Sequence, residues 1–397
     1  MHPALSQRQT RSLLDDSPTC RRLEVNLRRN VEQDHTALID ACAAAFCYED
    51  CRHEYWNPEQ YSLLWGTLLW EQASAAQRIV LNQLYWVAYY AQIVSAEIAT
   101  IFLNQVAAAG MYSFEDFRLV CDNLDVETKQ ERAHISAFKK VGEEVEHTLF
   151  GKRVFTYPMR SLHEHTMVFA DTSAARTFWR KLQLQAFMLL STSNAFLGSQ
   201  YLLIRGLRTL NGKLVQHQLG QFYRNHPDQA RAPVPSAISW YHFLDESFHF
   251  HTSRVVGLDV PRSLPSPTAF ERWIVNRGVA GCQRDHFNIS VVVNGIFWYD
   301  PATFPAIYTL LRSAVFGMEH EQAMQMLSAC FTRESDGLLA AAKTHRTAAD
   351  SYCAFIEPVK YLDGRNKEMR TMRSNSVGRH LGHNRQALAR FHPPALQ

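Results

Sequence analysis

Apolar residues recur at helical spacing along most of the chain, and strand-like alternation is confined to one short run. Long helices are predicted over residues 74–109 and 173–207, with further helical segments near 36–46, 113–120, 126–147, 213–224 and 237–256. The exception is ISVVVNGIFWY at 289–299, which reads as a strand. The pattern therefore predicts a mainly α-helical protein, with two or three more helices towards the C-terminus.

Turn and cap residues set the expected boundaries. Gly110 is expected to end the first long helix, Asp125 to cap a helix, and Asn211-Gly212 to form a turn. Residues 150–170 carry no regular pattern. We expect three parts: a polar, loosely docked segment over 1–35, a helical bundle over 36–257, and a mainly helical extension over 258–397.

The composition is that of a globular protein that binds neither nucleic acid nor membrane. Hydrophobic residues make up 46% of the 397 residues, and the net charge is only +3. The apolar run from Leu182 to Ile204 is interrupted by amide and hydroxyl side chains, so no transmembrane helix is expected. Eight scattered cysteines form no disulfide framework, which favours a cytoplasmic location.

Two Glu-x-x-His pairs stand out, Glu131 with His134 and Glu246 with His249. Residues three apart lie on one face of a helix, so both side chains of a pair can reach one metal ion. Carboxylate and imidazole donors suit iron. A single pair is usually a solvated helix face, but two pairs in apolar surroundings favour a metal site.

Two further residues extend this pattern. Glu97 lies in the middle of an apolar helix, where a carboxylate is unfavourable unless it is paired or ligates a metal. His242 lies four residues before Glu246 and seven before His249, so all three share one helix face. A lone carboxylate on one helix followed by Glu-x-x-His on the next is half of a di-iron bundle site.

The six residues Glu97, Glu131, His134, His242, Glu246 and His249 resemble, in order and spacing, the ligands of the p-aminobenzoate N-oxygenase family. The resemblance covers residues 75–255 and implies a ferritin-like bundle that holds two metal ions. It fails at one ligand, since no Asp or Glu occurs between Asp171 and Asp228. Gln216 and Asn194 are the candidates for that position, and water, Glu164 or Asp171 could also fill it.

Loss of one anionic ligand opens a coordination position that a halide could occupy. The chain is similar to the cyanobacterial cylindrocyclophane-type dimetal-carboxylate halogenases, including the segments LYWVAYYAQ, YHFLDESFHFH and NGIFWYDPA. This resemblance implies O2-dependent chlorination of an unactivated carbon in a fatty acyl chain on an acyl carrier protein. The cofactors would be two iron ions, or manganese and iron, with O2 and chloride or another halide. An amine N-oxygenase and a metal-storage bundle are the alternatives.

The remaining candidates lie around this set. Asp245 and His251 are expected to be neighbours of the ligands or surface groups, and the motif His163-Glu164-His165 is expected to lie at the surface. A basic C-terminal stretch, Lys360, Arg365, Lys367, Arg370 and Arg373, could dock an acidic carrier protein. A solvated helix face is the commoner explanation for such a stretch.

Overall fold

The fold is a bundle of α-helices in a computed structural model, which describes residues 12–112, 114–155, 178, 182, 194–293, 301–374 and 376–394. Within these residues there is no strand. The helices are α1 (Ser17–Glu32), α2 (Thr36–Ala45), α3 (Tyr48–Cys51), α4 (Leu68–Gln72), α5 (Ala75–Met111), α6 (Arg118–Phe150), α9 (Ala195–Arg224), α10 (Val234–Leu258), α11 (Ala269–Val293), α12 (Phe304–Arg312), α13 (His320–Thr332), α14 (Asp336–Ile356), α15 (Gly364–Lys367), α16 (Arg370–Arg373) and α17 (Val377–Leu388). Short 3₁₀ turns cover Leu13–Asp15, Glu115–Phe117, Gln229–Arg231, Val260–Arg262 and Pro301–Thr303.

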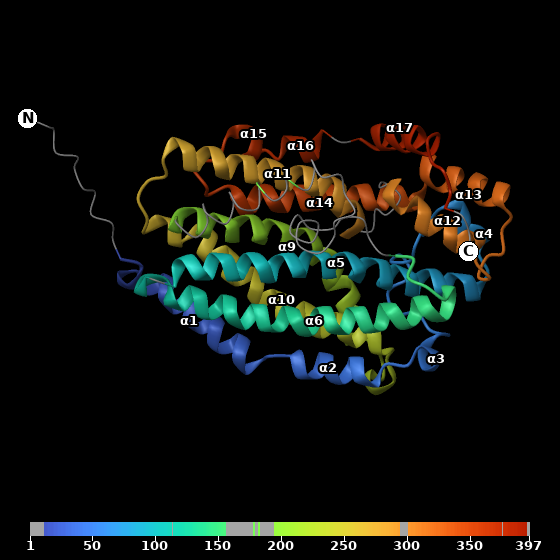
Figure 1. The fold of residues 1–397 in the computed structure, drawn as a ribbon, viewed down its shortest axis with the longest axis horizontal. Coiled ribbons are helices and arrows are strands. Elements are labelled where there is room, and N and C mark those ends of the chain that lie inside the picture. Colours follow the sequence, from blue (N-terminus) through green and yellow to red (C-terminus); the bar gives the residue numbers. More distant parts are fainter. Residues whose placement is uncertain are drawn as a thin grey trace, which may run out of the picture.

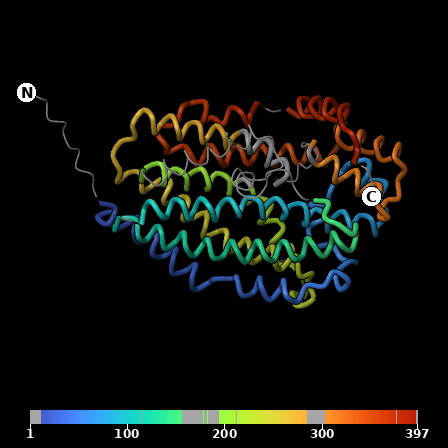
Figure 2. The backbone as a smooth tube through the Cα atoms, in the orientation of Figure 1, coloured from blue at the N-terminus to red at the C-terminus, as the bar shows by residue number. Residues whose placement is uncertain are grey.

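Four long helices, α5, α6, α9 and α10, form the centre of the bundle (Figure 1). α1 and α2 pack on α6 and α10, while α11 and α14 pack on α9. The chain trace shows α11 and α14–α16 on the side of α9 opposite α6 (Figure 2). The prediction of a mainly α-helical bundle is confirmed.

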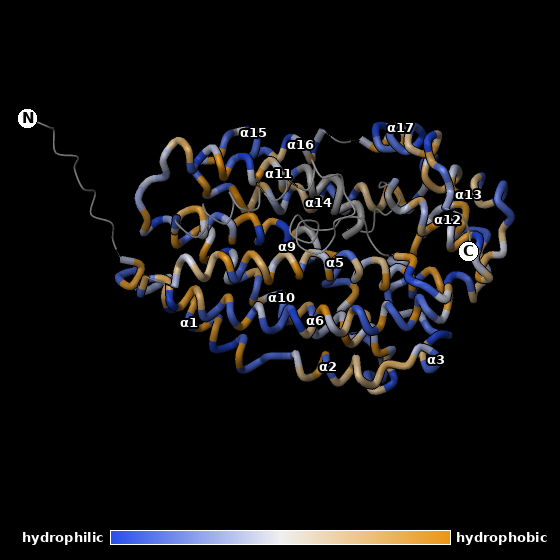
Figure 3. The backbone as a smooth tube through the Cα atoms, viewed as in Figure 1, coloured by the Kyte–Doolittle hydropathy of each residue, from blue (hydrophilic) through white to orange (hydrophobic). Residues whose placement is uncertain are grey.

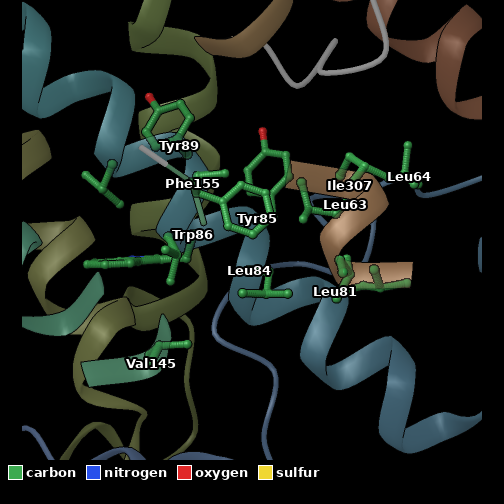
Figure 4. Packing of buried hydrophobic residues seen from close by; sticks show 14 of the residues in the cluster. Leu63, Leu64, Leu81, Leu84, Tyr85, Trp86, Tyr89, Val145, Phe155 and Ile307 are labelled. Atoms are coloured by element: carbon green, nitrogen blue, oxygen red, sulfur yellow. The ribbon is translucent and has the colours of Figure 1, made fainter. Parts of the chain in front are cut away.

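Helix α5 begins where its sequence predicts, but it runs through Gly110, the expected stop, and ends at Met111. Ser74 and Gln77 form a capping box, in which each side chain bonds the backbone N–H of the other residue. Its aromatic residues fill the core, with Tyr85, Trp86 and Tyr89 buried among leucines (Figure 4). The Trp86 indole N–H is satisfied by the Pro235 carbonyl at 3.0 Å and Ser239 Oγ at 2.9 Å.

Helices α9 and α10 approach closely because glycines line their contact. A Cβ added at Gly257 would lie 2.7 Å from the Leu203 Cα, and one added at Gly206 would lie 3.1 Å from the Ser253 Cβ. Near the other end, Gly220 lies against Trp240 in the same way. These contacts fix an antiparallel register that places residues 213–218 of α9 opposite residues 242–247 of α10.

Three local predictions from the sequence are wrong. Asn211-Gly212 forms no turn, because α9 runs through it; packing on α10 outweighs a helix cost of about 1 kcal/mol for a glycine. Asp125 does not begin a helix but lies exposed within α6. The predicted strand at 289–299 is helical over 289–293, and its remainder lies outside the described residues; a short apolar run does not distinguish a strand from a buried helix.

The polar N-terminal stretch also differs from its expected loose docking. Helix α1 buries Leu23, Asn26 and Asn30 against the bundle. The Asn26 amide donates to Thr252 Oγ1 at 2.9 Å and to Asn123 Oδ1 at 3.2 Å. Because these amides are satisfied by hydrogen bonds, a polar helix can be buried here, which a hydropathy pattern does not reveal.

One described helix, α5, is long and apolar enough to cross a membrane. It buries Asn82, Gln92, Glu97 and Asn104 inside the bundle, and colouring by hydropathy shows polar and apolar residues mixed along most helices (Figure 3). A core helix passes the same test of length and composition, so this is weak evidence for a membrane span.

Candidate metal centre

Three central helices bring the six predicted ligands together. Glu97 comes from α5, Glu131 and His134 from α6, and His242, Glu246 and His249 from α10. Their ligand atoms fall into two groups, within each of which the atoms lie no more than 4.8 Å apart: Glu97, His134, His242 and Glu246 form one, and Glu131, Glu246 and His249 form the other.

The first group converges on the Glu97 carboxylate. Its Oε1 lies 3.1 Å from His242 Nε2 and 3.7 Å from His134 Nδ1. Glu246 Oε1 lies 3.7 Å from His242 Nε2. Nε2 of His242 and Nδ1 of His134 therefore face the carboxylates.

The second group converges on His249. Its Nδ1 lies 2.9 Å from Glu246 Oε1 and 3.3 Å from Glu131 Oε1. The other oxygen of Glu131 lies 3.5 Å from His134 Nδ1, in the first group. Glu131 and Glu246 therefore each contact both groups and would help to hold both ions.

Burial and mutual charge shift the pKa values of the groups in this cluster. Burial raises the pKa of the Glu97 carboxyl, and the charge of Glu131 raises it further. Burial alone would lower the pKa of His249, but the Glu246 carboxylate beside it raises that pKa well above its usual value. For His134, the carboxylate of Asp245 likewise outweighs burial and raises the pKa. Three carboxylates in so small a buried volume require nearby positive charge.

The donor set fits two metal ions. Both Glu97 oxygens, Glu131 Oε2, His134 Nδ1 and His242 Nε2 are buried and have no hydrogen-bond partner of acceptable geometry. Buried polar atoms without a partner are rare, and an ion that is not included in the structure is one recognised explanation. Carboxylates with imidazoles suit iron or manganese. The residues that could hold the ions are therefore these six.

Two further side chains orient the histidines. His134 Nε2 lies 3.2 Å from Asp245 Oδ2, and His249 Nε2 lies 2.9 Å from Gln130 Oε1. In each case the hydrogen bond holds a proton on Nε2 and leaves Nδ1 free to ligate. Asp245 thus lies beside the ligands, as the sequence suggested for it.

Sequence reasoning missed Gln130 and the residues behind it. Gln130 Nε2 donates to Asn30 Oδ1 of α1 at 2.8 Å, and Asp245 Oδ1 is 2.7 Å from His35 Nδ1, just before α2. The only local signal was the position of Gln130 next to Glu131. Its partner lies 100 residues away in the chain, so no spacing rule could identify the contact.

A buried arginine joins the α10 end of the centre to three other helices. Arg205 of α9 pairs with Glu127 at 2.6 Å and donates to Asn104 Oδ1 at 2.8 Å, Ser253 Oγ at 2.9 Å and the His249 carbonyl at 3.0 Å. It therefore fixes the backbone that carries His249. A buried pair held by several hydrogen bonds loses stability strongly when one partner is removed.

Helix α9 carries the two candidates for the missing ligand, and the structure separates them. Asn194 caps α9, with Oδ1 accepting from the Leu197 N–H at 3.0 Å and Nδ2 donating to Glu271 at 2.6 Å, so it is engaged elsewhere. Gln216 is buried, its Oε1 has no partner, and it lies within the α9 segment opposite residues 242–247. Glu164, Asp171 and the motif His163-Glu164-His165 lie outside the described residues.

Other predicted residues lie apart from the ligand groups. His251 joins neither group, and burial followed by the nearby Arg254 lowers its pKa. In the basic stretch, Arg370 pairs with Glu368, Arg373 pairs with Asp350, and Lys367 donates to the Glu357 carbonyl. Lys360 and Arg365 remain exposed.

A helical bundle with a buried, histidine-rich carboxylate cluster defines a class of proteins that can hold two metal ions. The chain matches the family model "Acyl halogenase CylC-like" over residues 18–392 and belongs to that family of enzymes. Comparison with curated proteins and with solved structures gave no match.

Proposed function

We propose that this protein is an O2-dependent dimetal halogenase. It installs chlorine on an unactivated aliphatic carbon of a fatty acyl chain carried by an acyl carrier protein, in natural-product biosynthesis in the cytoplasm. The bound ions, two irons or one manganese and one iron, would supply the oxidising chemistry that such a C–H bond requires. One C–H bond, one chloride, one O2, two electrons and three protons give one C–Cl bond and two waters.

One observation carries the halide part of the proposal: the wall of the site formed by α9 has no carboxylate. The segment opposite His242 and Glu246 contains Gln216, which is buried with an unpartnered oxygen, and Lys213. Lys213 Nζ lies 4.5 Å from the centre of the Phe250 ring. Burial lowers the pKa of Lys213, and the charge of Glu246 opposes this only in part.

Charge balance supports an anion at this wall. The three ligand carboxylates and the neighbouring Asp245 contribute −4, two divalent ions would contribute +4, and Lys213 contributes +1, which leaves the centre positive. A fourth carboxylate on α9 would cancel that charge, whereas Gln216 leaves it. A buried positive centre attracts a small anion strongly, because the surroundings screen the charge little.

The decisive experiment is product analysis with the metal-loaded protein. It is incubated with a dodecanoyl acyl carrier protein, O2, a reductant and either chloride or bromide. We expect a product with the isotope pattern of the halide supplied. An oxygenated acyl chain in both buffers refutes the halogenase assignment, and an N–O product from an arylamine without halide favours an N-oxygenase.

Gln216→Glu tests the position of the halide. Restoring a carboxylate should abolish bromide binding, read as loss of the metal–bromine distance in X-ray absorption, while two metals still bind. The matched control is Gln218→Glu, which adds the same charge two residues further along at an exposed position. If Gln216→Glu retains the bromide signal, the halide does not bind at this wall.

A further inference from the structure

An open groove on the far side of α9 from α6 carries a concentration of positive charge. It lies between α11 and the segment 360–371, and it has a volume of about 900 Å³. Its lining includes Arg272, Arg277, Lys360 and Arg365, all exposed, and one carboxylate, Asp363. None of the four cations has an acidic partner within the described part of the chain, although Arg272 donates to a backbone carbonyl at 3.2 Å and Arg277 lies over an aromatic ring.

The groove combines two halves that are distant in sequence. Lys360 and Arg365 belong to the C-terminal basic stretch, whereas Arg272 and Arg277 come from α11. By contrast, two other arginines of that stretch are already paired with acids, as described above. In the folded protein these four cations therefore gather from two distant parts of the chain, an arrangement that the linear basic stretch did not reveal.

Polar contacts hold the floor of the groove rigid. The Asn276 side chain donates to the Tyr361 carbonyl at 3.1 Å and accepts from Asn366 Nδ2 at 2.8 Å and the Asp363 N–H at 2.7 Å. A site whose shape is fixed before binding loses less entropy on association.

Aromatic side chains flank the cations. Trp273 lines the groove and Phe270 stacks on it at 6.1 Å between ring centres, and each is 54% exposed. Exposed aromatic and arginine side chains are the types that dominate protein–protein interfaces. The chain as a whole is too weakly charged for nucleic acid, with a net charge of +3, so the local charge points to an acidic protein.

The groove lies one helix away from the metal centre. Its lining residue Tyr361 donates through its hydroxyl to Gln200 Oε1 of α9 at 2.5 Å. Five residues along α9, or about 7.5 Å of helix rise, Arg205 binds the carbonyl of His249. A partner held in the groove would thus be placed against the helix that walls the centre.

We propose that this groove is the docking site of the carrier protein that presents the acyl chain, and that it binds an acidic face of that protein. The inference rests on the proposed function for the identity of the partner. The positive rim would steer the acidic partner and the aromatic pair would anchor it.

The test measures binding separately from chemistry. Metal-free protein is titrated with fluorescently labelled dodecanoyl acyl carrier protein of bacterial fatty-acid synthesis, at low and high salt. The variant Arg272→Glu/Arg277→Glu/Lys360→Glu should bind at least about tenfold more weakly at low salt, and added salt should weaken the wild-type protein but not the variant.

The matched control is Arg28→Glu/Arg29→Glu/Arg231→Glu, which makes the same charge change at exposed positions away from the groove. It should bind like the wild-type protein, and Trp273→Ala should weaken binding without altering its salt dependence. Equal loss in both charge variants, or a wild-type protein that does not bind, overturns the docking proposal. Normal binding without halogenated product would instead count against the proposed function alone.

Discussion

Asp245 should control the affinity of one metal position through His134. In Asp245→Asn the side chain keeps its size but presents an N–H group, or a weaker acceptor, to His134 Nε2, 3.2 Å away. If the amide donates, His134 must carry its proton on Nδ1, the nitrogen that faces Glu97 and Glu131. A protonated Nδ1 cannot ligate. Loss of such a supporting group typically costs 10- to 100-fold in metal affinity, or about 1.4–2.7 kcal/mol.

The assay is anaerobic titration calorimetry with Co²⁺, which resolves two sites of different affinity. We expect Asp245→Asn to weaken the site of Glu97, His134 and His242 and to spare the other. The complementary variant is Gln130→Leu, which removes the acceptor for His249 Nε2 and should weaken the second site. The reasoning is refuted if circular dichroism shows an intact fold and Asp245→Asn leaves both affinities unchanged or lowers both equally.

Three further predictions concern stability. Glu97→Leu should stabilise the metal-free protein by about 1–3 kcal/mol, because it removes a buried carboxylate without good hydrogen bonds. It should also reduce the rise in melting temperature on adding metal, because one of the two ligand groups loses a carboxylate; an unchanged rise contradicts this. Gly257→Ala should lower the free energy of unfolding in urea by about 1–3 kcal/mol, since the added Cβ would lie 2.7 Å from the Leu203 backbone. Gly142→Ala, whose Cβ would lie 3.7 Å from its nearest neighbour, should leave stability unchanged or raise it. Similar values for the two variants would contradict the packing argument. Burial lowers the pKa of His380 to about 4, so this side chain binds a proton more readily in the unfolded protein than in the folded one. The free energy of unfolding should therefore fall by about 2 kcal/mol, after allowance for solvent screening, as the pH drops from 6.5 towards 4. His380→Asn should remove that pH dependence of stability, and an unaltered slope would contradict the prediction.

The buried cluster of glutamates and histidines could be predicted from sequence because its signal is local. The spacing of His242, Glu246 and His249 fixes a shared helix face before any tertiary contact forms. Glu97 could be identified because a carboxylate within an apolar helix is unfavourable unless it has a partner. The helices themselves follow from the same periodicity, which explains why the fold class is confirmed.

Local signals failed where packing decides the outcome. The turn chemistry of Asn211-Gly212 costs about 1 kcal/mol in a helix, and α9 recovers more than that by packing along α10. The apolar run at 289–293 suits a strand or a buried helix equally well. The cationic groove joins α11 to residues more than 80 positions later, so only the folded chain brings its charges together.

The two N-terminal helices support the candidate metal centre as directly as the helices that carry its glutamates and histidines. From α1, Asn30 holds Gln130, and Gln130 holds His249. From the start of α2, His35 holds Asp245, and Asp245 holds His134. Each chain of contacts ends on Nε2 of a ligand histidine, and the two histidines belong to different ligand groups. The polar character that predicted loose docking for this segment is thus what fixes the protonation of both histidines, because only polar side chains can relay a hydrogen bond into a buried site.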